Sequence, residues 1–179
     1  MRANLYEIAE KVRRGEPLPW AWVAVLSAAV PVVRLGMWRR LRQPRERVGA
    51  RVFSFGNITA GGTGKTPAFI ERARAELNAG HRVAVLTRGY GSQGGRLPEL
   101  LLPKEPSNGA HPWLGDEPAL IARRAPGVVV ARCRDRVAGA QAAIEQAGCD
   151  TLILDDGFQY VRLERDENIV LIDATNPFG

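Results

Sequence analysis

The sequence of 179 residues predicts an α/β fold in which a mostly parallel β-sheet carries helices on both faces, preceded by an apolar and basic helical segment. Two observations lead to this prediction. Short, continuous apolar runs recur from Arg51 onward, and stretches of helical character separate them. Continuous apolar runs are typical of strands that are buried on both faces, as in a parallel sheet between two helical layers.

Charge divides the chain into two predicted parts, a membrane-associating segment at 1–50 and a globular core at 51–179. Residues 1–51 contain eleven Lys or Arg and four Glu. The remaining residues contain fourteen Lys or Arg and fifteen Asp or Glu. The basic excess therefore lies entirely at the N-terminus. A near-neutral core argues against a broad nucleic-acid face, and a basic arm beside an apolar stretch fits an anionic membrane surface. Nothing in the sequence indicates an obligate protein partner.

The apolar part of this segment is the uncharged run at 17–33, which is followed by six arginines. It is shorter than the roughly 20 residues of a spanning helix, and Pro31 is expected to interrupt a helix near its end. Trp20, Trp22 and Trp38 flank the run, where interfacial aromatic residues tend to lie. Four interpretations remain open: a shallowly inserted or interfacial anchor, a helix buried against the core, a true span, and a cleaved signal peptide.

The core is expected to contain five strands, at 51–56, 81–89, 127–133, 151–157 and 168–175. Helices are predicted at 67–78, 116–125 and 134–148, with Pro67 in a first turn and Gly80 as a stop signal. Residues 90–115 are rich in Gly and Pro and predict a loop, with room for a hairpin. Ligands of such sheets bind at the carboxyl ends of the strands. Charged residues fall at these ends, namely Arg88, Asp155, Asp156 and Asp173.

The stretch GNITAGGTGKTP at 56–67 follows the first strand and precedes the first core helix. Its end fits the Walker A pattern G-x-x-x-x-G-K-[ST], although Thr59 stands where the first glycine belongs. Backbone N–H groups, a helix N-terminus, a lysine and a hydroxyl together hold phosphates and Mg²⁺. The sequence therefore predicts a P-loop NTPase-like fold that binds ATP and Mg²⁺ through Gly61, Gly62, Thr63, Gly64, Lys65 and Thr66. The alternative is a glycine-rich turn that binds nothing.

Other motifs offer candidates for the metal and for catalysis. LILDD at 152–156 matches a Walker B strand, so Asp155 and then Asp156 are candidate magnesium ligands, with a turn or cap as the alternative. Asp116 and Glu117 either cap a helix or serve as a base and a magnesium contact. Each of three arginines either neutralises phosphate or forms surface ion pairs; they are Arg88, Arg134 and Arg136.

The two cysteines and two histidines show no metal-ligand spacing. Cys133 and Cys149 are expected to be reduced thiols of a cytosolic domain. His81 and His111 are isolated, and surface or loop positions are expected for both.

Six ordered stretches resemble the tetraacyldisaccharide 4′-kinase family, the lipid A 4′-kinase of Gram-negative bacteria. They are SFGNITAGGTGKTP, LTRGYG, GDEP, RCRDR, LILDDGFQ and VLIDATNPFG, and they cover Ser54 to Gly179. The N-terminal segment is similar to the membrane-contacting lead segment of the family. The family loop carries Ser or Thr at the position of Thr59, where the general Walker A pattern has glycine.

The resemblance implies transfer of the γ-phosphoryl group of ATP to the 4′-hydroxyl of tetraacyldisaccharide 1-phosphate, the lipid A precursor, at the cytoplasmic face of the inner membrane. By motif, it implies that Lys65 and Thr66 contact phosphate and Mg²⁺. Asp116 would be the catalytic base with Glu117 near the metal, and Asp155 and Asp156 would bind magnesium. Substrate contacts would come from Arg88, Tyr90 and Arg136.

The chain departs from the family in two respects. Tyr160 stands where the family has histidine after DDGFQ, and a tyrosine does not titrate near neutral pH. Family members also continue past PFG, so the chain is expected to be a fragment without full kinase activity.

Two other functions remain open from the sequence alone. One is a membrane-associated P-loop ATPase of the partitioning or targeting type. The other is a nucleotide-binding module without catalysis. The stretches RGYG, GDEP and DDGFQ favour the kinase over a generic switch protein, which would not need them.

Overall fold

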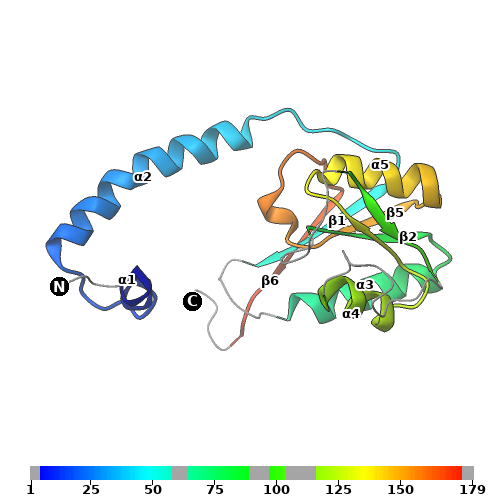
Figure 1. Ribbon diagram of the computed structural model, residues 1–179, viewed down its shortest axis with the longest axis horizontal. Helices are drawn as coiled ribbons and strands as arrows, with labels where there is room; N and C mark the ends of the chain where they lie inside the picture. Colours follow the sequence, from blue (N-terminus) through cyan, green and yellow to red (C-terminus); the bar gives the residue numbers. More distant parts are fainter. Residues whose placement is uncertain (1–4, 58–63, 89–96, 104–115, 175–179) are drawn as a thin grey trace. The chain divides into compact units, whose positions relative to one another are not determined.

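A six-stranded sheet forms the centre of the unit Pro44–Phe178 in the computed structural model of the chain (Figure 1). The structure describes residues 5–57, 64–88, 97–103 and 116–174. The strands are β1 (Arg51–Asn57), β2 (Val83–Thr87), β3 (Glu99–Leu101), β4 (Val129–Arg132), β5 (Thr151–Leu154) and β6 (Glu167–Leu171). Their order is β3-β4-β2-β5-β1-β6, and all pairs are parallel except β3 with β4.

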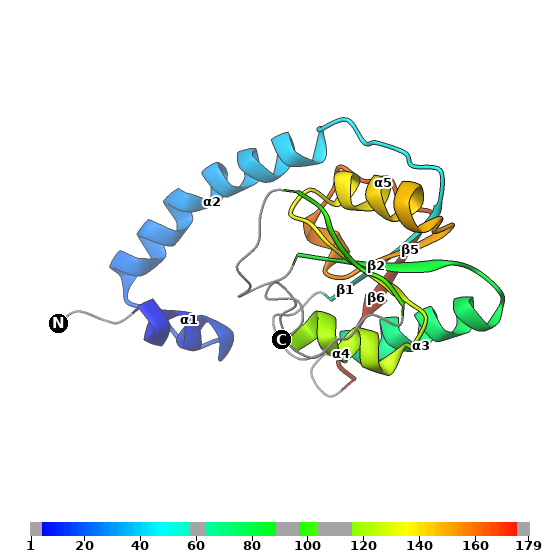
Figure 2. The ribbon, with the colours of Figure 1, turned by 45° about the vertical axis from the view of Figure 1, so that its right-hand side comes forward.

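Helices cover both faces of the sheet, as predicted. Figures 1 and 2 show α5 (Arg136–Ala147) on one face, and α3 (Lys65–Asn78) and α4 (Asp116–Arg124) on the other. A hydrophobic core lies between the sheet and the helices on each face, and alternate residues of a strand pack into one core or the other. In β1, Val52 packs in the core beneath α5, whereas Phe53 and Phe55 pack with Phe69 of α3 in the other core.

The predicted elements agree with the structure in kind and differ at their ends. The helix predicted from Pro67 begins two residues earlier, at Lys65, because Gly64 turns the chain in the left-handed region, with φ of 75°. The strand predicted to reach 157 ends at Leu154, because Asp155–Gly157 turns into the 3₁₀ helix η1 (Gly157–Gln159). The last strand ends at Leu171, four residues earlier than predicted.

One strand was not predicted. β3 lies inside the stretch 90–115, for which a loop with room for a hairpin was expected, but it pairs with β4 outside that stretch. Three residues are too few for a periodic signal, and the strand exists because it pairs antiparallel with β4 at the sheet edge. There Glu99 lies opposite Arg132 and forms an ion pair with it at 2.8 Å.

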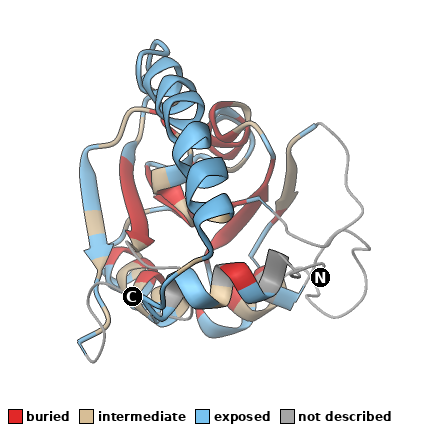
Figure 3. Ribbon diagram, turned by 90° about the vertical axis from the view of Figure 1, so that its left-hand side faces the viewer, coloured by how far each residue is buried: buried red, intermediate tan, exposed pale blue. Residues whose placement is uncertain are grey.

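The unit Met1–Gln43 contains α1 (Leu5–Arg13) and α2 (Trp20–Leu41). The prediction that Pro31 interrupts the helix was wrong, because α2 continues through it to Leu41. A proline costs a helix one hydrogen bond and a clash with the preceding turn, but residues of high helix propensity, such as Arg34, Leu35 and Met37, continue the helix beyond it. None of the residues of α2 is buried (Figure 3), and by length and composition the helix could cross a membrane, a test that signal sequences also pass.

Candidate active site

The carboxyl ends of four neighbouring strands bring the predicted site residues to one edge of the sheet. β4, β2, β5 and β1 are adjacent and parallel, so the segments that follow them leave the sheet on the same side. Backbone pairing extends past the strand ends: the N–H of Asp155 donates to Leu86 at 3.1 Å, and that of Cys133 donates to Thr87 at 3.2 Å. Asp155, Arg88 and the start of α5 therefore lie at one edge.

The N-terminus of α3 provides a phosphate-binding geometry at this edge. Gly64 is its N-cap, with no side-chain hydrogen bond to the first turn, and that turn contains no acidic residue. Helix N-termini present unpaired N–H groups and the positive end of the dipole to anions. Lys65 and Thr66 open the helix and are half-buried. The predicted ligands Gly61, Gly62 and Thr63 lie outside the described residues.

The ammonium group of Lys65 forms an ion pair with Asp156, the second acid of the predicted Walker B stretch. The lysine comes after β1 and the aspartate after β5, so the contact joins the two motifs that the sequence placed 91 positions apart. Asp155, the first acid, is 7% exposed and directly follows β5. The positive charge of Lys65 and the negative charges of Asp155 and Asp156 therefore lie at the same edge of the sheet.

The acidic turn is tightly packed against β1. Asp156 has φ of 50°, in the left-handed region that non-glycine residues seldom adopt. Gly157 follows, and a Cβ atom there would lie 2.2 Å from the Oγ atom of Ser54. One residue later, the ring of Phe158 lies against Gly56, where a Cβ atom would come within 2.4 Å of it. The turn is therefore fixed at the point where β1 leads into the glycine loop.

Arg136, the first residue of α5, is buried at this edge, with 5% exposure. Its guanidinium donates to the carbonyl of Cys133. Burial lowers the pKa of Arg136 most, the charge of Asp155 acts against that, and the charge of Arg88 lowers it further. Arg136 is therefore within electrostatic reach of both predicted site residues, so three sequence-predicted residues are brought together.

The remaining predicted residues are placed less completely. Asp116 begins α4 and is exposed. The chain passes from the end of α4 directly into β4, so the beginning of α4 lies toward the carboxyl edge of the sheet. The side chain of Glu117 and all of Tyr90 lie outside the described residues. Asp173 follows β6 at the same edge and is half-buried.

Comparison with known proteins decides the family. The model of the family described as "Tetraacyldisaccharide-1-P 4'-kinase" matches residues 18–179. This chain belongs to the tetraacyldisaccharide-1-P 4'-kinase family. The resemblance proposed from the six motifs is thereby confirmed.

Curated relatives carry the same name. Tetraacyldisaccharide 4'-kinase of Syntrophus aciditrophicus is 51% identical over 138 residues, which cover 74% of this chain and 36% of the relative. That of Anaeromyxobacter dehalogenans strain 2CP-C is 43% identical over 170 residues, which cover 92% and 43%. The chain thus spans less than half the length of these relatives.

A solved structure of the family shares the fold. A crystal structure of LpxK from Aquifex aeolicus in complex with ATP is 31% identical, with a TM-score of 0.66 over 84% of this chain and 50% of that chain. The predicted P-loop NTPase-like class is therefore confirmed.

The residues of this 4'-kinase family member fit a magnesium ion at the acidic turn. Mg²⁺ prefers oxygen ligands and usually takes only one or two carboxylates, with waters and phosphate oxygens completing its shell. Asp155, Asp156 and the hydroxyl of Thr66 are oxygen donors at one edge. The part of the chain that the structure describes holds no group of three His, Cys, Asp or Glu that would suit a metal bound by protein alone.

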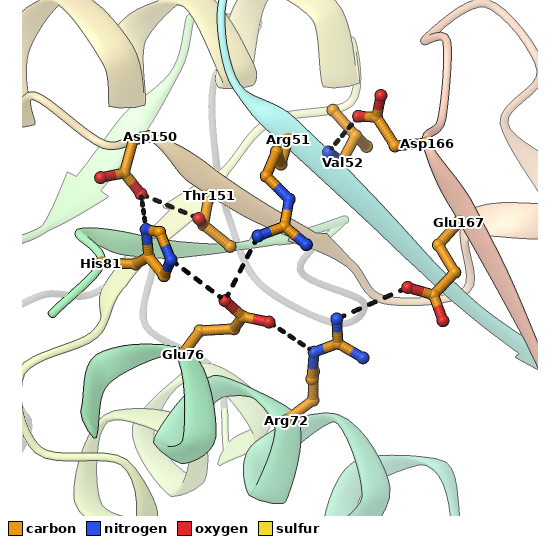
Figure 4. A network of polar contacts seen from close by, with 9 residues as sticks. All are labelled: Arg51, Val52, Arg72, Glu76, His81, Asp150, Thr151, Asp166 and Glu167. Carbon is orange, nitrogen blue, oxygen red and sulfur yellow. Dashed lines mark hydrogen bonds and ion pairs between the residues drawn. The ribbon is translucent and has the colours of Figure 1, made fainter. Parts of the chain in front are cut away.

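Sequence reasoning missed how α3 is held at its other end. The carboxylate of Glu76 in α3 lies 2.7 Å from Arg72, 3.8 Å from His81 and 3.9 Å from Arg51. Figure 4 shows this arrangement. Arg72 also reaches Glu167 of β6 at 3.5 Å. His81, expected to be isolated, lies between Glu76 and Asp150, with its Nδ1 atom 3.3 Å from the carboxylate of Asp150. An i, i+4 spacing of Arg72 and Glu76 was the one available signal.

Proposed function

We propose that the whole protein transfers the γ-phosphoryl group of ATP to the 4′-hydroxyl of tetraacyldisaccharide 1-phosphate, with Mg²⁺ as cofactor. The observation that carries this proposal is the contact of Lys65 with Asp156 at the beginning of α3, because it joins a phosphate-binding lysine to a metal-binding acid. The names of the curated relatives supply the acceptor. The two alternatives that the sequence left open were a membrane-associated ATPase and a nucleotide-binding module without catalysis. Neither is supported by the names of the relatives.

Each residue of the nucleotide site has a separate task in this proposal. The glycine loop at 61–64 surrounds the phosphates with backbone N–H groups, and Lys65 neutralises the charge of the transferred group. Thr66, Asp155 and Asp156 would hold Mg²⁺, together with Glu117. Bound magnesium would neutralise charge on the phosphate oxygens.

The acceptor side would use the exposed Asp116 as catalytic base for the 4′-hydroxyl. Arg88, Tyr90 and Arg136 would orient the substrate at the same edge. Phosphoryl transfer depends mainly on positioning and charge neutralisation, which rigid side chains at one sheet edge are suited to provide.

The segment 1–50 would attach the protein to the cytoplasmic face of the bacterial inner membrane. α2 exposes apolar side chains along its length, and Arg39 and Arg40 lie in its last turn. Apolar residues would enter the acyl region while the arginines meet anionic headgroups. The acyl chains of the acceptor would then remain in the bilayer.

The experiment that tests the function follows the phosphate of γ-labelled ATP. Label in the lipid acceptor supports the kinase, whereas label released only as inorganic phosphate, with or without lipid, contradicts it and supports the ATPase. Lys65→Ala should abolish nucleotide binding, and Lys11→Ala, at an exposed lysine of α1, is the matched control. Unchanged ATP affinity in Lys65→Ala would refute both nucleotide functions.

A further inference from the structure

A cluster of four polar side chains surrounds the beginning of α5, outside the set of residues given a role above. It consists of Asp135, Tyr160, Arg162 and Glu46 and is here called the Asp135 cluster. The hydroxyl of Tyr160 donates to Oδ1 of Asp135, and the guanidinium of Arg162 donates to Oδ2 at 3.1 Å. Arg162 also binds Glu46, next to the parallel bridge between Glu46 and Leu163.

Asp135 is the N-cap of α5. Its Oδ1 accepts the N–H of Val137 at 3.0 Å, and its own carbonyl accepts the N–H of Gly139 at 3.0 Å. An N-cap fixes the backbone of the first helical turn. The first residue of that turn is Arg136, so the carboxylate that Tyr160 and Arg162 orient also sets the backbone from which the buried arginine extends.

Arg136 needs such a setting because it is a buried cation. Its Nε atom is buried without a hydrogen-bond partner, and one Nη atom donates to Cys133. A buried guanidinium is stable only in a narrow geometry that keeps its counter-charge close. Asp155 supplies that charge. A small shift of the helix start would move the guanidinium away from it.

Tyr160 acts in the cluster as a neutral hydrogen-bond donor. Burial, followed by the hydrogen bond and the charge of Asp135, raises the pKa of Tyr160 to about 12. For Asp135, burial would raise the pKa, but the hydrogen bonds of Tyr160 and Val137 and the charge of Arg162 outweigh it, so the pKa is lowered. Neither Tyr160 nor Asp135 therefore changes its protonation state near neutral pH.

We propose that Asp135 is a positioning residue, which Tyr160 and Arg162 hold so that it keeps the buried guanidinium of Arg136 on the carbonyl of Cys133 at the nucleotide-binding edge. The inference rests on the proposed function only for the ligands that meet at this edge, namely the acceptor that Arg136 would orient and the magnesium nucleotide that Asp155 would hold. Asp135 itself touches no reacting atom.

The test compares Tyr160→Phe, which removes one hydroxyl, with Tyr160→His, whose ring N–H again donates to Asp135. Arg162→Met and Arg47→Met form a second pair: both remove exposed arginines that bind acids, but Arg47 binds Glu164 and Asp166 and does not contact Asp135. Each variant is measured in the intact chain, at a temperature where circular dichroism shows it to be folded.

Two readouts are recorded. The first is the NMR signal of the Arg136 Nε–H group, which requires no nucleotide. We expect it to shift and exchange faster with water in Tyr160→Phe and Arg162→Met, to return in Tyr160→His and to be unchanged in Arg47→Met. The second is the affinity for ATP with Mg²⁺, which should weaken about three- to tenfold in the first two variants, as for the loss of one ordinary hydrogen bond.

The outcomes separate the two proposals. An unchanged Arg136 signal in Tyr160→Phe and Arg162→Met overturns the positioning role, whatever the nucleotide data show. Equal changes in Arg47→Met, or no recovery in Tyr160→His, overturn it too, because they indicate general destabilisation. If the unaltered chain binds no ATP, the proposed function fails while the Arg136 signal still decides the role of Asp135.

Discussion

Gly157 lies where the acidic turn passes closest to β1. A Cβ atom at this position would lie 2.2 Å from Oγ of Ser54 and 2.9 Å from Cβ of Leu154. Both neighbours are fully buried, so neither can move aside into solvent. The absence of a side chain at one residue thus allows Asp155 and Asp156 to lie against the strand that leads into the glycine loop.

We expect Gly157→Ala to lower the free energy of unfolding by about 1–3 kcal/mol, because overpacking a rigid interior displaces its neighbours. Urea denaturation measures this change. Gly49→Ala is the matched control, since a Cβ atom there meets nothing within 4 Å. Adding Ser54→Ala should restore part of the stability, because that hydroxyl has no hydrogen-bond partner and its loss makes room. Equal stabilities of the two glycine variants would contradict the close packing.

At the scale of single elements, α3 is held at both ends by charge. Its first residue meets Asp156, and Glu76 in its last turns meets two arginines and a histidine from three different segments (Figure 4). Arg72 also lies over the ring of Phe53, with the guanidinium carbon 3.8 Å from the ring centre. The helix that presents the phosphate site is therefore fixed to the sheet far from that site.

Glu76→Gln tests this attachment. Replacing the carboxylate leaves cations without their counter-charge, and because these cations are partly exposed we expect a loss of about 1–3 kcal/mol in the free energy of unfolding, less than for a fully buried pair. Glu71→Gln makes the same chemical change on the same helix at a carboxylate that is 71% exposed, and should cost less than about 0.5 kcal/mol. Chemical denaturation of both variants decides, and a loss in Glu71→Gln as large as in Glu76→Gln would refute the attachment.

For α2, the exposed apolar residues predict binding to lipid vesicles. Val30→Asp should weaken binding on the order of 100-fold if the helix enters the acyl region, where a carboxylate costs about 2.5–3.5 kcal/mol. Val12→Asp, at a similarly exposed valine of α1, should change it little. Co-sedimentation with anionic vesicles measures the binding. Failure of the unaltered chain to bind such vesicles would remove the membrane attachment from the proposed function.

For the molecule as a whole, the sequence predicted the architecture of the core better than its edges. Strand and helix types were predictable because apolar runs and caps are local signals, as in 151–154 and at Gly148. β3 was not, because three residues form a strand only through their pairing with β4. That Lys65 and Asp156 lie at one edge of the sheet was predictable from two motifs, although their ion pair was not. The contact of Tyr160 with Asp135 belongs to no motif and required the folded structure.

The stability of the core should fall in alkali. Burial raises the pKa of Cys149 from 9.0 to about 11, and that of Tyr160 from 10.0 to about 12. Because the folded state favours both neutral forms, their contribution is complete below the unfolded pKa values and is lost as pH rises through the folded ones. Urea midpoints should decline from pH 9.0 upward, and less steeply toward about pH 11 in Cys149→Ala. Parallel declines in the two proteins would contradict the shifted thiol.

The two buried cysteine thiols, which form no disulfide, allow local opening of the sheet to be measured. Cys133 follows β4 at the nucleotide edge, and Cys149 precedes β5 at the opposite edge, each 3% exposed. An alkylating reagent reaches a buried thiol only during local opening, so the two labelling rates measure how often each end of the sheet opens. ATP with Mg²⁺ should slow the labelling of Cys133 more than that of Cys149, which mass spectrometry of the two peptides can follow.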